Sequence, residues 1–197
     1  MTHKRIFVLN GHPAASSLSR LFAENYLDAA RKAGHDLRIT HLHDLEFDPD
    51  FENGGYANSK PLEPDLEMVF DNLKWSEHVV LLTPMWWGGL PAKLKGLIDR
   101  TFLPGTAFDT RNTSRLGLPS PLLLGRTARV IMTSDTPNWF FRHVYKYAMI
   151  RQLRAQILGF VGFKPTRFTH FTGASHPETA TVELWSKKVA ELGMNAK

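Results

Sequence analysis

Short apolar runs alternate with helical patterns along almost the whole chain, and this alternation constrains the fold more than any other feature. Residues 6–9, 79–82 and 130–132 are apolar throughout, as is typical of strands covered on both faces. Residues 37–42 and 167–171 add two more predicted strands, of which the last is polar enough for a sheet edge. Helical patterns lie between the strands, at residues 17–33, 65–75, about 91–102 and 141–158. This α/β order predicts a doubly wound sheet of five parallel strands in the order 2-1-3-4-5.

The chain of 197 residues is long enough to bury a core, and we expect residues 1–197 to form a single domain. It contains no cysteine, which excludes disulfides, thiolate nucleophiles and cysteine-ligated metal centres. The N-terminal apolar run is too short for a signal peptide, and no run approaches the ~20 residues that span a bilayer. We therefore expect a cytoplasmic protein without a transmembrane segment.

Two long segments lack clear periodicity and are predicted as loops. Residues 43–64 and 103–126 each contain several prolines, and irregular connections of this length are uncommon unless they have a function. A shorter connection at residues 175–178 reads Ser-His-Pro-Glu. It resembles a capping box that opens the last helix.

Charge is distributed unevenly although the net charge is only +5. Residues 44–77 hold ten acidic and two basic side chains, whereas residues 111–167 hold ten basic side chains and one acidic side chain, Asp135. The basic region is either a solvated face or a patch for an anionic partner, such as a phosphorylated cofactor or an acidic surface of another chain. No recognisable nucleic-acid-binding motif accompanies it, so we do not expect a nucleic-acid partner.

Three unusual segments each follow a predicted apolar strand, at residues 10–19, 83–91 and 133–139. The strands that precede them are neighbours in the predicted order, so their carboxyl ends would bring these segments together. Open α/β folds bind ligands in this crevice. We therefore expect the three turns to surround one planar ligand that carries a phosphate.

The first segment carries hydroxyls at Ser16, Ser17 and Ser19, where a helix begins. Free backbone N–H groups at a helix start can hold a phosphate, and one serine can cap the helix at the same time. No G-x-x-x-x-G-K-[ST] loop is present, and no G-x-G-x-x-G motif follows the strand, which argues against a Walker A loop and a Rossmann-type NAD site. Neutral hydroxyls at a helix end suit a phosphate that is bound and not transferred. His12 is either a further ligand of this phosphate or a structural residue, because the sequence does not reveal its donor tautomer.

The second segment contains two adjacent tryptophans followed by two glycines. Gly88 and Gly89 allow the backbone to approach a ligand closely, and Trp86 or Trp87 can form a wall for a flat ring. Alternatively, the tryptophans pack on each other, in the core or in a dimer interface. Leaving both indoles in water is costly, so we expect one of these fates.

The third segment favours a structural interpretation over a catalytic one. Asp135 precedes Thr136 and Pro137, which predicts an N-cap with proline in the first helical turn. His41 and His43 would share one face of a strand, but no further ligands follow at the usual spacing, so we expect no metal site. No Gly-x-Ser-x-Gly elbow is present.

Several motifs together resemble the NAD(P)H:quinone reductase family of flavodoxin-like flavoproteins, including its small bacterial members. The most specific is Pro84-Met-Trp-Trp-Gly-Gly-x-Pro-Ala-x-Leu-Lys-Gly-x-x-Asp99. The others are Gly11-His12-Pro13 with the serines that follow, Asp44-Leu45…Phe47-x-Pro49, Phe102 with Ala107-Phe108, and Phe160-x-Gly-Phe163. The similarity therefore covers nearly the whole chain.

The resemblance implies a flavodoxin-like fold, an FMN or FAD cofactor, and NADPH or NADH as hydride donor to a quinone-like acceptor. Donor and acceptor would occupy the same place in turn, in two-electron ping-pong chemistry that the cofactor carries. The resemblance also implies a homodimer in which Phe108 helps to complete the partner's site. It assigns substrate contacts to Trp87 and Phe108, and flavin contacts to His12, Ser16, Ser17, Leu18, Ser19, Pro84, Met85, Trp86, Trp87, Gly88, Thr133, Ser134, Asp135 and Thr136.

The chain departs from this family where larger quinone reductases handle the charge of the reduced flavin. Those enzymes have Thr-Thr-Gly-Gly where this chain has residues 133–136. They also place a tyrosine and a histidine at the positions that Phe141 and Tyr147 occupy here. His143 and Tyr145 lie nearby and are the candidate catalytic residues in their place. The departures leave the charge relay and the preference for quinones open.

Two other functions fit the resemblance. One is a flavin-binding regulatory or ancillary subunit that docks on a transporter or another partner through the basic region. The other is a one-electron flavodoxin, which ranks last because those carriers are typically acidic and this chain has a pI near 9.6. The short chain favours FMN over FAD, and the basic region mildly favours NADPH over NADH. The sequence does not identify the acceptor.

Overall fold

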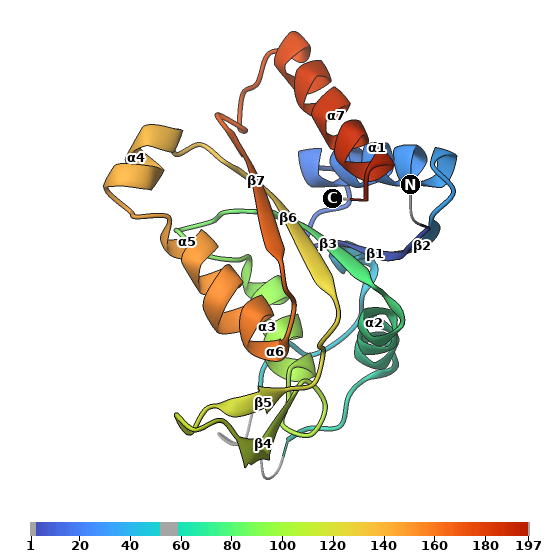
Figure 1. The fold of residues 1–197 in the computed structure, drawn as a ribbon. Helices are drawn as coiled ribbons and strands as arrows, with labels where there is room; N and C mark the ends of the chain where they lie inside the picture. Colours follow the sequence, from blue (N-terminus) through green and yellow to red (C-terminus); the bar gives the residue numbers. More distant parts are fainter. Residues whose placement is uncertain (1–2, 52–58, 197) are drawn as a thin grey trace.

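The computed structural model describes residues 3–51 and 59–196, so residues 52–58 of the predicted loop 43–64 lie outside the described residues. One parallel sheet has the order β2-β1-β3-β6-β7 (Figure 1). Its strands are β1 (Arg5–Asn10), β2 (Asp36–His41), β3 (His78–Pro84), β6 (Thr127–Ser134) and β7 (Thr166–Thr172). This is the predicted order, renumbered because two short strands precede β6, so the predicted fold is confirmed.

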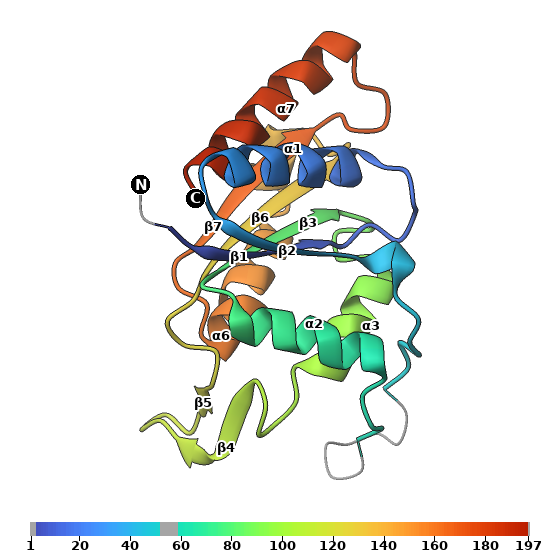
Figure 2. The ribbon, with the colours of Figure 1, turned by 90° about the vertical axis from the view of Figure 1, so that its right-hand side faces the viewer.

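Helices cover both faces of the sheet (Figure 2). Helices α1 (Leu18–Lys32) and α7 (Thr179–Met194) lie on one face. The other face carries α2 (Pro64–Trp75), α3 (Ala92–Thr101) and a helical run from α5 (Ala148–Arg151) through η3 (Gln152–Leu158) to α6 (Gly159–Val161). Within residues 3–51 and 59–196, none of the helices combines the length and the apolar character that crossing a membrane requires.

The apolar runs of the strands follow from this two-sided cover. Along β1, Ile6 and Val8 belong to the core under α1 and α7, whereas Phe7 and Leu9 belong to the core on the other face. A strand that is buried on both faces needs apolar residues at every position. The continuous apolar run at residues 6–9 therefore correctly predicted a strand that is buried on both faces.

The strand register places the predicted functional turns side by side. Asn10 at the end of β1 pairs with Leu82 of β3, and Pro84 at the end of β3 pairs with Thr133 of β6. Neighbouring parallel strands end at the same edge of a sheet, so the segments that follow them begin at that edge. The turns after β1, β3 and β6 therefore start within one short stretch of that edge.

The predicted loop 103–126 contains a hairpin that the sequence analysis missed. Strands β4 (Phe108–Thr113) and β5 (Pro119–Pro121) pair antiparallel, with Phe108 opposite Pro121 and an irregular register further on. The hairpin projects beyond the main sheet (Figure 1). Proline lacks the N–H group that a strand ladder uses, and strands rich in proline are confined to edges. Because of Pro119 and Pro121, the sequence of this hairpin was therefore read as a loop.

The predicted helix 141–158 is interrupted. A short helix α4 (Asn138–His143) ends before a break, and the second helical run begins at Ala148. Lys146 and Tyr147 in the break have φ values of 50° and 54°, in the left-handed region that a right-handed helix excludes. Neither residue type signals this conformation, so periodicity alone suggested one continuous helix.

Close packing of α7 on α1 leads to the prediction that Gly193→Ala destabilises the protein. A Cβ atom at Gly193 would meet the backbone of Tyr26, with Tyr26 C and Cα only 3.1 Å away. Backbone atoms cannot rotate aside, so the helices would have to separate, at a cost of about 1–3 kcal/mol. Urea unfolding measures this cost. Gly89→Ala is the matched control, because its Cβ would come no nearer than 4.0 Å to Trp86 O. Equal midpoints for both variants would contradict the expectation.

Candidate functional site

The three predicted turns meet around one cleft, which consists of two adjoining pockets. The inner pocket has a volume of about 210 Å³ and the outer pocket about 560 Å³. They share Met85, Ser134 and Asp135. The inner pocket is also lined by His12, Ser16, Ser17, Leu18, Ser19, Pro84, Trp86, Thr133, Ala174 and Ser175, and the outer pocket by Trp87, Gly88, Thr136, Phe141, Tyr145 and Ala148.

The serine turn forms one wall of the inner pocket. Ser17 is the N-cap of α1, and its side chain accepts a hydrogen bond from the backbone N–H of Arg20 at 3.2 Å. The other N–H groups of the first helical turn have no acceptor within the helix itself. These groups carry partial positive charge at a helix N-terminus, where an anion is favoured. Capping and an anion-binding wall therefore occur in the same turn.

Close backbone packing holds this turn in place. Gly11 N–H donates to Leu82 O at 2.7 Å, which ties the turn to β3. A Cβ atom at Gly11 would lie 2.6 Å from the Leu94 side chain and 3.0 Å from Leu82 O. Only glycine allows β1 to leave the sheet so close to both elements.

His12 presents a defined tautomer. Its Nδ1 atom accepts the backbone N–H of Ala14 at 3.0 Å. A ring nitrogen that accepts carries no proton, so the neutral imidazole has its proton on Nε2. Burial lowers the pKa of His12, which keeps the ring neutral at pH 7. His12 therefore offers an N–H donor at the inner pocket, a property that the sequence could not reveal.

The histidines that were considered as metal ligands have other partners. His41 Nδ1 accepts from the side-chain amide of Asn10 at 3.1 Å, and His43 Nδ1 donates to Pro13 O at 3.1 Å. The buried Asn10 also accepts the backbone N–H of His12 at 3.2 Å. These contacts brace the serine turn from the side of β2.

The double-tryptophan turn is a tight reversal. Trp86 and Gly89 exchange backbone hydrogen bonds of 3.0 Å and 2.9 Å. The two central residues, Trp87 and Gly88, have φ values of 51° and 77°. Both values are positive, as in a type I′ turn, and an aromatic residue adopts this conformation at a cost.

The exposure of these tryptophans excludes one of the alternatives considered for them, burial in the core of this chain. Trp86 contacts the ring of His12 edge-on, with the ring centroids 5.5 Å apart, but the Trp86 residue is still 43% exposed. Trp87 is fully exposed. We expected both indoles to be covered by each other, a core, an interface or a ligand. Neither is buried within this chain, so a ligand or a partner is left to cover them.

A fourth segment, which the sequence analysis missed, completes the inner pocket. The carboxylate of Asp135 accepts hydrogen bonds from Ser175 N–H at 2.8 Å and from Ser175 Oγ–H at 2.5 Å. Ala174 N–H donates to Ser134 O at 3.2 Å. The Ser175 hydroxyl and then its N–H lower the pKa of Asp135 below its usual value. Asp135 thus fastens the segment after β7 to the segment after β6.

These contacts correct two predictions. Asp135 is not a helix N-cap, because α4 begins after Pro137 and Asp135 binds Ser175 instead. Residues 175–178 are not a capping box, because the N-cap of α7 is Glu178 and no side chain of the described residues caps that helix. In both cases local sequence suggested a local partner, whereas the actual partner is 40 residues away.

The two candidate catalytic residues lie in different settings. Tyr145 lines the outer pocket, is 50% exposed and contacts Phe140 edge-on at 4.9 Å. His143, at the end of α4, is exposed and lines neither pocket of the cleft. Phe141 is buried, lines the outer pocket and packs against Tyr147.

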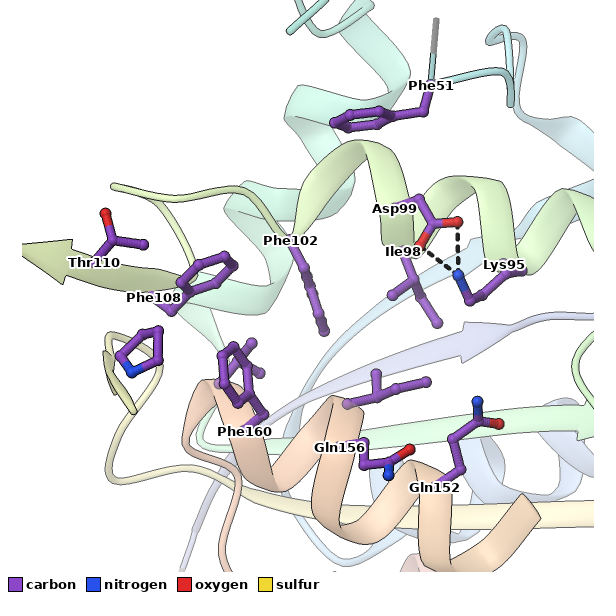
Figure 3. Close-up of a pocket in the computed structure, with 13 residues that line it drawn as sticks. Phe51, Lys95, Ile98, Asp99, Phe102, Phe108, Thr110, Gln152, Gln156 and Phe160 are labelled. Carbon is purple, nitrogen blue, oxygen red and sulfur yellow. Dashed lines mark hydrogen bonds and ion pairs between the residues drawn. The ribbon is translucent and has the colours of Figure 1, made fainter. Parts of the chain in front are cut away.

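Phe108 faces a separate pocket of about 690 Å³ that lies between α3, the hairpin and the 152–161 helical run (Figure 3). Its ring is 7% exposed and contacts Phe160 at 5.2 Å. Phe51 and Phe102 line the same pocket. Phe108 therefore does not line the cleft of its own chain.

The comparisons with known proteins agree with this architecture. A family model described as having a flavodoxin-like fold matches residues 4–192. An uncharacterized NAD(P)H oxidoreductase of Haemophilus influenzae is 30% identical over 121 residues, which cover 60% of this chain and 58% of that protein. An FMN-dependent NADH:quinone oxidoreductase of Beijerinckia indica is 31% identical over 131 residues, or 64% of this chain and 61% of that protein.

A solved structure is similar over its whole length. An NAD(P)H:quinone oxidoreductase of Methanothermobacter marburgensis superimposes with a TM-score of 0.82 at 20% identity, and all of both chains is covered. At this identity the likeness concerns the fold alone. The alignments with the two curated relatives span less than two thirds of their length.

Proposed function

Because the chain belongs to the flavodoxin-like family whose model matches residues 4–192, we propose that it is an FMN-dependent NAD(P)H oxidoreductase that reduces quinones or similar acceptors. FMN would occupy the cleft, and NADPH or NADH would supply the hydride. We further propose that residues 1–197 act as one flavin-binding domain in the cytoplasm. The relative named as an NAD(P)H oxidoreductase and the one named as an FMN-dependent NADH:quinone oxidoreductase support this assignment.

One observation carries the proposal: a cleft with an anion-binding wall at one end and aromatic side chains at the other. The inner pocket has the capped start of α1, its serines and the His12 donor. The outer pocket has Trp87, Phe141 and Tyr145. A phosphate suits the first environment and a flat ring suits the second. FMN has both parts at its two ends.

The residues of the chain would hold and orient the cofactor. Ser16 to Ser19 and the first N–H groups of α1 would bind the phosphate, while His12 donates from Nε2. Pro84 to Gly88 and residues 133–136 would border the ring system. When bound, FMN supplies the hydride chemistry, whereas the protein positions the reactants and excludes water.

Donor and acceptor would use the outer pocket in turn, in the ping-pong order that the resemblance implies. Trp87 would cover a bound nicotinamide or quinone, which would explain an indole that is left fully exposed. Tyr145 lines this pocket and is the better placed of the two candidate catalytic residues. His143 would need a change in the α4 segment, or a partner chain, to reach the reacting atoms.

We propose a homodimer that uses the face around Phe108. The pocket there is lined by several apolar side chains, among them Phe51, Phe102 and Phe160. Phe108 can reach a substrate only in the cleft of another copy, because it does not line its own. The molecular mass in solution, measured by sedimentation, tests this directly, and a monomer would contradict it.

The colour and the spectrum of the purified protein test the function. We expect a yellow protein, or one that becomes yellow on addition of FMN, whose visible absorbance bleaches anaerobically with NADPH or NADH. Addition of a quinone should restore the absorbance with multiple turnovers. Mass spectrometry of the released cofactor should give the mass of FMN and not of FAD.

Two results would redirect the assignment. A colourless protein that gains no flavin on soaking would refute the proposed function. A flavin that bleaches but turns over too slowly to matter would favour the ancillary subunit. In that case, neutralising the exposed residues Arg151 and Arg154 should abolish binding to the partner.

A further inference from the structure

His170 lies directly behind the cleft, on a strand that contributes none of the predicted turns. It is a residue of β7, and its Nε2 atom lies 2.8 Å from Ser134 Oγ. Its ring contacts the buried ring of Phe141 edge-on at 5.1 Å. Phe141 and Ser134 both line the outer pocket, whereas His170 lines neither pocket. His170 therefore touches two residues of the cleft wall from outside the cleft.

The surroundings of the ring decide which nitrogen carries the proton. Burial lowers the pKa of His170, so the ring is neutral at pH 7 and one nitrogen is protonated. Nδ1 is buried, and the described residues offer it no hydrogen-bond partner. A buried N–H without an acceptor is rarer in proteins than a buried acceptor without a donor. The proton therefore belongs on Nε2, which donates to Ser134 Oγ.

This donation fixes the direction of the Ser134 hydroxyl. An oxygen that accepts from His170 keeps its own hydrogen, and that hydrogen must point away from the ring. Among the described residues, His170 is the only hydrogen-bond partner of Ser134 Oγ. Ser134 lines both the inner and the outer pocket. The hydroxyl proton is therefore available to an acceptor in the cleft.

We propose that His170 is a positioning residue, which makes Ser134 a hydrogen-bond donor to the ligand of the cleft. The inference deepens the proposed function and rests on it for the identity of that ligand, FMN. Acceptor oxygens and nitrogens occur in every part of FMN, so a hydroxyl with a fixed direction is useful at the junction of the two pockets. His170 acts through Ser134 and does not touch the cofactor.

The tautomer of His170 can be measured without any cofactor. In ¹⁵N-labelled protein at pH 7, correlations between ring protons and ring nitrogens distinguish a protonated from an unprotonated nitrogen. The His170 signals are identified by their loss in His170→Phe. We expect a protonated Nε2 and an unprotonated Nδ1. A protonated Nδ1 would overturn the proposal, because Ser134 would then have to donate its proton to the ring.

A double-mutant cycle tests the link to the cleft. The affinity for FMN is measured by quenching of flavin fluorescence in the wild type, Ser134→Ala, His170→Phe and the double variant. Loss of one hydrogen bond predicts an affinity about tenfold lower for each single variant. If His170 acts through Ser134, the double variant loses no more than either single variant. Losses that multiply would overturn the proposal.

Controls separate this test from general damage to the fold. Ser134→Thr keeps the hydroxyl and should retain most of the affinity. Thr172→Val, two residues along β7 from His170, should leave the affinity unchanged. If the wild type binds no FMN, the proposed function fails, whereas the tautomer measurement still decides the role of His170 toward Ser134.

Discussion

Ser17→Asp should abolish tight FMN binding while helix α1 remains capped. Aspartate is as good an N-cap as serine, so it can accept the Arg20 N–H that Ser17 accepts now. Its charge, however, would stand in the turn where we place the phosphate. Two like charges brought together at a partly desolvated site cost several kcal/mol, so we expect the FMN affinity to fall roughly 100-fold or more.

The matched control is Ser17→Asn, which has the same shape as the aspartate variant and no charge. Asparagine also caps helices well, so both variants should unfold at about the wild-type denaturant concentration. The asparagine variant should lose only a few-fold in affinity, measured by titration of flavin fluorescence. Equal affinities of the two variants would mean that the phosphate lies elsewhere.

Arg100→Met should be among the most destabilising single substitutions in this chain. Arg100 in α3 is 1% exposed and lies among groups of the segment that precedes α2. It donates to Asp48 O at 2.5 Å, to Pro61 O at 2.8 Å and to the Glu63 carboxylate at 2.8 Å and 3.2 Å. Breaking a buried pair by removing one partner costs about 3–5 kcal/mol. Glu63 is 29% exposed and can regain some water, which favours the lower end of that range.

Thermal and denaturant unfolding measure this loss. For a domain of this size, each kcal/mol lowers Tm by about 2–4 °C, so a fall of roughly 10 °C is expected. Lys95→Met is the control on the same helix, because its pair with Asp99 is exposed on both sides and is worth about 0.5 kcal/mol or less. If both variants unfolded together, the Arg100 contacts would not be what holds Asp48, Pro61 and Glu63 to α3.

The sequence predicted the parts of the fold that depend on burial. Continuous apolar runs at residues 6–9 and 79–82 require cover on both faces, and the structure supplies it. The strand order was then predicted as the common doubly wound order for five parallel strands. That order alone was enough to predict that the serine, tryptophan and Asp135 turns lie together.

The parts that were missed depend on partners far apart in the chain. Nothing near Asp135 indicates that it binds Ser175, and nothing near Ser134 points to His170. Both partners come from β7 or the segment after it, which the sequence analysis treated only as an edge strand and a helix start. Backbone conformation was the other obstacle, since Trp87, Lys146 and Tyr147 adopt positive φ without being glycine or asparagine.

The wall at the start of α1 has a consequence for how the cofactor is retained. Among the described residues that line the inner pocket, neither lysine nor arginine occurs, so the phosphate would be held by hydroxyls, backbone amides and a neutral imidazole. Dissolved ions weaken attraction between exposed charges far more than they weaken partly buried hydrogen bonds. A protein built this way would keep FMN over a wide range of ionic strength. A protein that binds the phosphate through surface cations would release FMN as the salt concentration rises.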